Sequence, residues 1–247
     1  MKIIISPAKK MNIDTDTYAC KDLPVFLNET REILTFLKSR SHEELQKLWN
    51  CNDKIAQQNF DRLRDMNLES RLTPAIISYE GIQYQYMAPG VFSSAQLDYV
   101  CDHLRILSGF YGILKPFDGV TPYRLEMQTK AKFGGKKDLY DYWGDKVYKA
   151  LTASDHVILN LASKEYSKCV ERFLTDEDTF VTCVFGELVG EKVVQKGTLA
   201  KMARGEMVRF LAETGGEKPE DAKAFDRMGF RFRDDLSTEK EYVFIKE

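Results

Sequence analysis

The sequence predicts an α/β (α+β) fold, a single compact unit over residues 1–247 in which helices flank a mixed β-sheet. Short apolar runs rich in β-branched residues alternate along the chain with segments whose apolar residues repeat at helical spacing. The hydrophobic share of 43% is typical of a globular protein. Because no internal repeat, low-complexity tract or linker divides the chain, we expect one domain.

The N-terminal part of the chain is predicted to begin with a buried strand and to continue as helix. Residues 2–6 form a β-branched run that ends at a proline. Apolar residues recur at helical spacing over residues 25–65, where Ser41 and Glu44 make a capping box. Residues 75–79 form a second apolar run, which predicts another strand.

The middle of the chain predicts two further helices. Ser93 and Gln96 make a second capping box. The apolar residues that follow share one helix face: Leu97, Val100, Leu104 and Leu107. Gly109 stands where a helix commonly ends on a glycine. Residues 138–151 then have the pattern of an amphipathic helix.

The C-terminal part of the chain is predicted to alternate strands and helices. Residues 157–162 form the clearest interior strand, and Ser163 is placed to cap a helix that runs to about residue 173. Residues 180–185 form another strand, and a helix over residues 199–213 follows it, ended by a pair of glycines. The last predicted strands lie over residues 230–233 and 241–246.

The composition excludes a membrane span and favours a cytoplasmic protein. No apolar run approaches the ~20 residues that a transmembrane helix requires. The five cysteines are scattered, with no CxxC pair and an odd total, so we expect reduced thiols rather than disulfides. Nothing in the sequence indicates a membrane partner or an obligate protein partner.

The net charge of −2 hides an uneven distribution of charge along the chain. Residues 104–137 carry seven Lys or Arg against two acids, and residues 192–209 carry five against one. Such clustering either forms a positive patch, which would bind an anionic partner such as DNA, or covers solvated faces of the protein. Both interpretations remain open at this point.

Ser6 and Lys9 form an S-x-x-K pattern directly after the first predicted strand. In some acyl-transfer enzymes a lysine at this spacing activates a serine nucleophile, but the S-D-N and K-T-G signatures that accompany it are missing here. The alternative is that Lys9 is a fixed cation at the end of the strand, where α/β proteins place their ligands.

A similar arrangement follows the strand over residues 157–162. Ser163 begins a helix whose first turn carries Lys164 and Tyr166, and the free N–H groups of a helix start favour a phosphate or carboxylate. Asn160 lies inside the apolar run and needs hydrogen-bond partners. The alternative is a serine that only caps the helix, beside a lysine that is exposed to solvent. The candidate catalytic residues of both strand ends, with no reaction assigned, are Ser6, Lys9, Ser163 and Tyr166.

The helix predicted over residues 199–213 carries Lys201 and Arg204 along one side, with Arg209 nearby. These bases either contact phosphate or form a solvated basic face. The three histidines lie far apart, and HExxH, Walker A and GxGxxG patterns are absent, so no metal ion or cofactor is expected.

Residues 104–114 join a predicted helix end to two glycines, Gly109 and Gly112. A helix-hairpin-helix element connects two helices by a glycine-bearing turn, whose backbone N–H groups bind DNA phosphates without reading the bases. The glycines here are three residues apart, whereas the usual hairpin has them two apart. The alternative is a structural turn that packs against the core.

Five sequence blocks follow one another along the chain: ISPAK (5–9), LRILSGFYGILKPFDGVTPYRLEM (104–127), KDLYDYWGD (137–145), VILNLASKEYSK (157–168) and AKMARGEMVRF (200–210). Together they resemble the YaaA family of peroxide-stress proteins over essentially the full length. The resemblance implies a cytoplasmic bacterial protein that limits oxidative damage and lowers free intracellular iron. It also implies a mixed α/β fold with a positively charged cleft and a helix-hairpin-helix element that binds duplex and distorted DNA.

The matching blocks contain the residues expected to bind DNA or another anion. They are Lys9, Arg105, Gly109, Gly112, Lys115, Arg124, Asn160, Ser163, Lys164, Lys201, Arg204 and Arg209. We therefore expect a peroxide-stress protein that binds DNA without sequence specificity. The alternative is an enzyme that acts on an anionic small molecule or a nucleic acid in the same basic cleft. Direct iron binding has no ligand cluster in the sequence.

Overall fold

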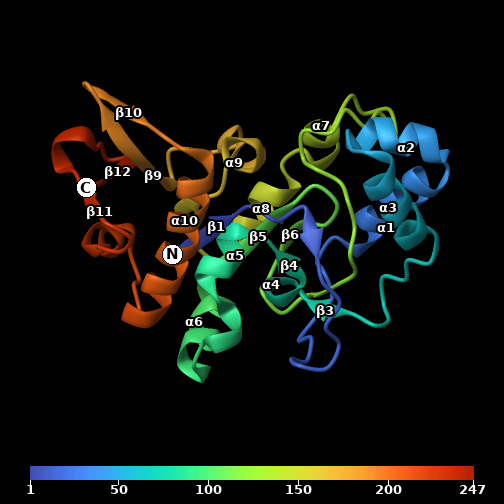
Figure 1. The fold of residues 1–247 in the computed structure, drawn as a ribbon, viewed down its shortest axis with the longest axis horizontal. Coiled ribbons are helices and arrows are strands. Elements are labelled where there is room, and N and C mark those ends of the chain that lie inside the picture. The colour runs from blue at the N-terminus through green and yellow to red at the C-terminus, as the bar shows by residue number, and fades with distance from the viewer.

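The computed structural model describes residues 1–247 and has a mixed eight-stranded β-sheet at its centre (Figure 1). Its strands are β1 (Lys2–Ile5), β5 (Leu104–Ser108), β6 (Gly112–Leu114), β8 (Val157–Leu161), β9 (Thr179–Val189), β10 (Lys192–Val194), β11 (Phe230–Phe232) and β12 (Glu241–Lys246). Across the sheet the order is β11-β12-β9-β8-β1-β5-β6, and β10 pairs with β9 as a hairpin. The predicted α/β fold with a mixed sheet is confirmed.

The parallel strands of the sheet create a topological switch point beside β1. This strand pairs in parallel with β5 on one side and with β8 on the other, and β9 and β12 continue the parallel run. Numbered along the chain, the parallel strands have the order 2-1-3-4-5, which is a common doubly wound order. Ile5 pairs with Leu161, so β1 and β8 end at the same edge of the sheet. Ligands of such sheets bind outside the carboxyl ends of the strands at this point.

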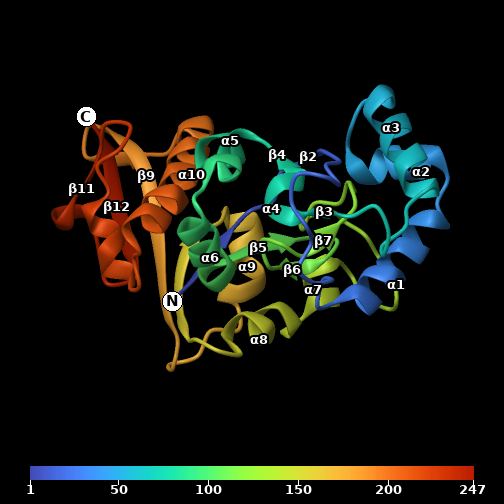
Figure 2. The ribbon, with the colours of Figure 1, turned by 90° about the horizontal axis from the view of Figure 1, so that it is seen from below.

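The helices are spread along the whole length of the molecule, at both ends and between them (Figure 1 and Figure 2). In both views α1–α3 lie at one end, and α10 lies with β9–β12 at the other (Figure 1 and Figure 2). The α-helices are α1 (Leu27–Lys38), α2 (His42–Trp49), α3 (Asp53–Arg64), α4 (Ala75–Ser78), α5 (Ile82–Met87), α6 (Ser94–His103), α7 (Leu139–Trp143), α8 (Lys146–Thr152), α9 (Lys164–Glu171) and α10 (Gly197–Thr214). Short strands β2 (Lys10–Met11), β3 (Thr73–Pro74), β4 (Tyr79–Glu80) and β7 (Gly119–Val120) and three 3₁₀ helices, Pro89–Val91, Pro219–Ala224 and Asp234–Leu236, complete the elements.

A core of 59 buried apolar residues surrounds the sheet. Ile3, Ile4 and Ile5 of β1 are fully buried, because strands flank β1 on both sides and neither face meets solvent. A strand buried in this way has a continuous apolar sequence rather than an alternating one. This is why the first strand was visible in the sequence.

Residues 104–114 form a β-hairpin, so the predicted helix-hairpin-helix element is wrong. Helix α6 ends at His103, and β5 follows directly, pairing with β1 and, antiparallel, with β6. Gly109 lies in the turn of this hairpin rather than at a helix end. Gly112 has a φ of 74°, and a Cβ on this residue would lie 2.9 Å from the ring of Trp143. The apolar residues that fit one helix face also fit a buried strand, and pairing with β1 decides between the two.

Two further predictions need correction. Of residues 75–79, predicted as a strand, the first four form the single turn of α4 and only Tyr79 is extended, as the start of β4. An apolar run of five residues cannot distinguish a strand from a buried helical turn by its pattern. Residues 138–151, predicted as one helix, form α7 and α8, because Gly144 has a φ of 52° and turns the chain between them.

The remaining predicted elements are confirmed in kind, with shifted bounds. Residues 25–65 contain α1, α2 and α3, and both predicted capping boxes, at Ser41 and Ser93, are formed. Gly215 ends α10 in the left-handed conformation, with a φ of 68°. Strand β9 extends to Val189, beyond its predicted end, because it continues into the hairpin with β10.

Candidate functional site

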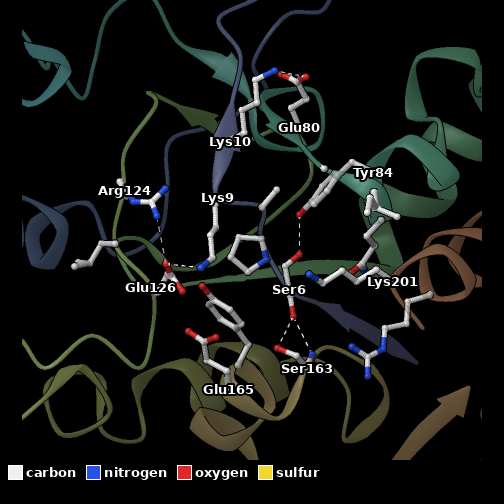
Figure 3. A pocket seen from close by; sticks show the side chains of 18 of the residues that line it. Ser6, Lys9, Lys10, Glu80, Tyr84, Arg124, Glu126, Ser163, Glu165 and Lys201 are labelled. Atoms are coloured by element: carbon white, nitrogen blue, oxygen red, sulfur yellow. Dashed lines mark hydrogen bonds and ion pairs between the residues drawn. The ribbon is translucent and has the colours of Figure 1, made fainter. Parts of the chain in front are cut away.

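A cavity of about 380 Å³ lies at the carboxyl ends of β1 and β8, which is the switch point of the sheet (Figure 3). We call it the switch-point cavity. Its walls come from the loop after β1, the start of α5, residues 123–126, the start of α9 and the first half of α10. The fold thus brings together residues that are far apart in the sequence. The predicted site residues that line the cavity are Ser6, Lys9, Arg124, Ser163, Tyr166, Lys201 and Arg204.

Ser6 and Ser163 tie the ends of β1 and β8 together beneath the cavity. The backbone N–H of Ser163 donates to Oγ of Ser6 at 2.9 Å, and the Ser6 hydroxyl donates to Oγ of Ser163 at 3.2 Å (Figure 3). The Tyr84 hydroxyl donates to the Ser6 carbonyl at 3.0 Å. Lys9 does not bond to Ser6, because its Nζ pairs with Oε1 of Glu126 at 2.9 Å. The hydroxyl of Ser6 therefore contacts no base in this arrangement.

The bases on the Lys9 side of the cavity are paired with carboxylates. Glu126 accepts from Lys9 and also lies 3.9 Å from Nη2 of Arg124. Lys10 pairs with Glu80 at 2.5 Å, and Figure 3 places this pair at the edge of the site. These four side chains and Arg124 hold one another in place, so much of their charge is already compensated.

Lys201 and Arg204, one turn apart on α10, have no such partners. Neither side chain lies within ion-pair distance of a carboxylate, and neither makes a hydrogen bond. Nε of Arg204 is buried and orphaned, and burial lowers the pKa of its guanidinium because desolvation disfavours the charged form. Arg204 is partly buried, and a cation that is taken out of water without a partner costs free energy, whereas Lys201 is exposed. The two bases therefore leave an uncompensated positive charge at the cavity.

Gly205 fixes the position of these two bases. A Cβ on residue 205 would lie 2.1 Å from the carbonyl oxygen of Gln83 on α5, so only glycine allows α10 to cross α5 this closely. This contact places Lys201 and Arg204 in the same wall of the cavity as the start of α5.

Further polar groups of the cavity lack partners. Gln83 is only 6% exposed, yet the Nε2 of its side chain makes no hydrogen bond. Nε of Arg124 is buried and unbonded as well. Sequence patterns gave no signal for Gln83, because a glutamine in a short helix is ordinary until its surroundings are known. Three orphaned donors in one cavity call for acceptors that the protein itself does not supply.

The start of α9 adds an acid and a phenol to the cavity. Burial raises the pKa of Glu165, and the neighbouring charge of Glu126 raises it further. Burial also raises the pKa of Tyr166 well above its usual value, so this phenol stays protonated and able to donate. Glu165 was not a predicted site residue, although it stands between two that were.

Other predicted site residues do not line the switch-point cavity. Arg105 donates to the carbonyls of Cys101 and Leu104, at 3.1 and 2.7 Å, and Lys115 pairs with Asp22 at 3.4 Å. The remaining ones outside it are Gly109 and Gly112 in the hairpin, Arg209, which pairs with Glu213, and Asn160 and Lys164, which line a neighbouring cavity. Asn160 finds its partners in Thr182 and the N–H of Ala162.

A groove of about 820 Å³ adjoins the switch-point cavity, and Lys9 and Glu126 line both. We call it the basic groove. Its bases are Lys9, Arg40, Lys47, Lys130 and Lys132, and its acids are Glu44 and Glu126. Sequence clustering pointed to Lys130 and Lys132 but not to Arg40 and Lys47, because the latter come from the distant α1–α2 region.

The structure contains no cluster of metal-ligating side chains, and two of its five thiols are buried. No group of three or more His, Cys, Asp or Glu side chains is arranged to hold a metal ion. Burial raises the pKa of both Cys169 and Cys183 to about 12, which keeps these thiols protonated and poorly reactive. No helix combines the length and apolar character needed to cross a membrane.

Comparison with known proteins assigns the family. A sequence profile described as "Peroxide stress protein YaaA" matches residues 1–236. A UPF0246 protein of Agathobacter rectalis is 59% identical over 247 residues, covering 100% of this chain and 99% of that protein. UPF0246 proteins of Lachnoclostridium phytofermentans and Pediococcus pentosaceus are 56% and 51% identical over 246 residues, covering 100% of this chain and 96% and 98% of theirs. This chain therefore belongs to the YaaA family of peroxide stress proteins.

Proposed function

We propose that this chain serves the peroxide-stress response in the cytoplasm by binding a small anionic ligand in the switch-point cavity. The observation that carries the proposal is the pair of unpartnered bases, Lys201 and Arg204, in the wall of that cavity. Other bases, such as Lys9 in the same cavity and Lys115 outside it, pair with carboxylates. A bound anion would supply the partner that Lys201 and Arg204 lack.

The size and position of the cavity support a small ligand. Its volume of about 380 Å³ falls in the range of roughly 300–1,000 Å³ that small-molecule sites occupy. Its place at the carboxyl ends of β1 and β8 is where doubly wound sheets bind ligands. The orphaned amide of Gln83 and Nε of Arg124 provide further donors that would fix the orientation of the ligand.

Titration calorimetry with a panel of anions tests this proposal. The panel contains inorganic phosphate, AMP and citrate, and the proteins are the wild type, Lys201→Met and Arg204→Met. We expect at least one anion to bind the wild type and to lose about tenfold or more in affinity, roughly 1.4 kcal/mol, in each variant. Lys54→Met is the matched control, because Lys54 is an exposed lysine of α3 outside the cavity. The proposal fails if no anion binds, or if Lys201→Met behaves like Lys54→Met.

A second candidate function is the DNA binding that the family resemblance implies, and the basic groove favours it. Five bases face two acids along this groove, and Lys47, Lys130 and Lys132 have no carboxylate partner within ion-pair distance. The hairpin of residues 104–114 and the loop after it offer no such support, because Arg105 of the hairpin and Lys115 of the loop are bonded within the protein. The DNA proposal therefore rests on the groove.

Fluorescence anisotropy with duplex and junction DNA tests this second candidate. Phosphate-dominated binding must weaken steeply as the salt concentration rises. We expect Lys47→Ala combined with Lys132→Ala to lower both the affinity and the salt slope, the latter by about one unit per lost phosphate contact. Arg105→Ala is the control and should leave both unchanged. Undetectable affinity at low salt, or no effect of the groove variants, rules out this use of the groove.

A further inference from the structure

We propose that the ligand of the switch-point cavity is a sugar phosphomonoester. Its phosphate would lie between the N-terminus of α9 and the bases Lys201 and Arg204, and its hydroxyl groups would face Glu126 and Glu165. The inference rests on the proposed function, since it assigns a chemical class to the same anionic ligand.

The N-terminus of α9 is open to an anion because its cap residue is turned away. Ser163 occupies the cap position, but its side chain makes no capping bond and contacts Ser6 instead. The backbone N–H groups of Lys164 and Glu165 consequently donate to no acceptor within the protein. Because Ser163 accepts from Ser6, its own O–H is free to donate. The helix dipole adds positive potential at the same place.

The charge of the cavity matches a phosphomonoester better than a carboxylate. Five bases line it, Lys9, Lys10, Arg124, Lys201 and Arg204, against three acids, Glu80, Glu126 and Glu165, which leaves an excess of two positive charges. A phosphomonoester carries about −1.5 to −2 at pH 7 and presents three acceptor oxygens. A carboxylate brings one charge and two oxygens. At this end the cavity offers the backbone N–H of Glu165, the Ser163 hydroxyl and two cationic side chains, and a phosphate uses these donors more completely than a carboxylate does.

The rest of the cavity fits a hydroxylated carbon skeleton. Figure 3 places Ser163 and Lys201 on one side of the site, and Glu126 and Glu165 on the other. Glu126 pairs with Lys9 and Glu165 accepts from the N–H of Gln128 at 3.3 Å, but each carboxylate keeps further lone pairs that hydroxyl donors of a ligand would use. The orphaned Nε2 of Gln83 needs an acceptor, and a hydroxyl oxygen can serve as both donor and acceptor. A sugar offers several such hydroxyls, whereas a simple organic acid does not.

The volume limits the size of this ligand. About 380 Å³ is near the lower end of small-molecule sites, at roughly 300–1,000 Å³. That space suits a pentose phosphate or a mononucleotide and not a polymer. Free sugar phosphates and nucleoside monophosphates share the same phosphate and hydroxyl chemistry, so the experiment must separate them.

Titration calorimetry of the full chain with ribose 5-phosphate, AMP, ribose and inorganic phosphate tests the inference. We expect ribose 5-phosphate or AMP to bind at least tenfold more tightly than inorganic phosphate, and ribose alone to show no binding. Lys201→Met should weaken every phosphate-bearing ligand about tenfold. Glu165→Gln should weaken only the ligands that carry a sugar and leave inorganic phosphate unchanged. Lys54→Met controls for the loss of one positive charge. Tighter binding of AMP than of ribose 5-phosphate would identify a nucleotide, and the reverse order a free sugar phosphate.

The outcomes separate failure of the inference from failure of the proposed function. If citrate binds through Lys201 as tightly as the sugar phosphates, or if the sugar adds nothing to the affinity of phosphate, the ligand class is wrong while anion binding stands. If no anion shows binding that depends on Lys201 or Arg204, the proposed function itself is wrong, and the inference falls with it.

Discussion

The β5–β6 hairpin with its following loop, residues 104–119, and the first half of α10 both present bases, but these bases differ in what they contact. Arg105 donates to two backbone carbonyls, and Lys115 pairs with Asp22. Lys201 and Arg204 have no partner at all. The hairpin is the more conspicuous of the two in the sequence, yet its glycines and bases serve packing. The difference is the reason for placing the proposed ligand site at α10 rather than at the hairpin, because bases without a partner in the protein favour an external anion.

The largest expected effect comes from Gly205, which determines where α10 carries its bases. In Gly205→Ala the new Cβ would lie 2.1 Å from the Gln83 carbonyl oxygen, so α10 and α5 must separate. We expect a loss of about 3 kcal/mol in the free energy of unfolding, measured by urea denaturation. Gly197→Ala is the control, because a Cβ on residue 197 of the same helix meets nothing within 4 Å. Equal stabilities of the two variants would contradict the close crossing.

On the hairpin side, the buried carboxyl of Asp118 should make stability depend on pH. Its Oδ2 accepts from the N–H of Lys115 at 2.8 Å, its Oδ1 is unbonded, and burial raises its pKa to about 6. An unfolded aspartate titrates near 3.8. As the pH rises from that value to about 6, the unfolded chain loses its proton first, so the folded state loses stability, by about 3 kcal/mol in all.

Replacement of Asp118 by asparagine should remove this loss. The stability of Asp118→Asn relative to the wild type should therefore increase by about 2 kcal/mol between pH 4 and pH 7, and stay constant above pH 7. Urea denaturation at each pH measures the difference. A difference that does not change with pH would mean that Asp118 titrates normally in the folded protein.

The same contrast explains which parts of the structure could be predicted from sequence patterns. Strands β1 and β8 were found within one residue of their ends, because strands buried on both faces are continuous apolar runs. Strand β5 was predicted as helix, because Leu104 and Leu107 also fit one face of a helix. Only the pairing with β1 distinguishes a strand from a helix here. Lys201 and Arg204 were found by their helical spacing. Gln83 was not, because a glutamine in a short helix shows no sign of burial until the packing of α5 against α10 is known.

Removal of an arginine from each region should have opposite effects on stability. Arg105→Met breaks two hydrogen bonds to carbonyls and should cost about 1 kcal/mol of unfolding free energy. Arg204→Met replaces a partly buried, unpartnered cation with an apolar side chain, and should leave stability unchanged or raise it by about 1 kcal/mol. Thermal unfolding of both variants measures the contrast. Cells that carry Arg204→Met should nevertheless lose peroxide protection, whereas a destabilised Arg204→Met protein would mean that Arg204 serves the fold.

One lysine substitution in each region should change stability very little but should differ clearly in its effect on anion binding. Lys115 forms an exposed pair with Asp22, and Lys201 is exposed without any pair, so Lys115→Met and Lys201→Met should each change the unfolding free energy by less than about 1 kcal/mol. Anion affinity should fall about tenfold only in Lys201→Met, because only Lys201 lines the switch-point cavity. Calorimetry on the two variants under identical conditions decides the matter. An equal loss of affinity in both would mean that the ligand responds to the overall charge of the protein rather than to a site, because the two substitutions change the charge equally.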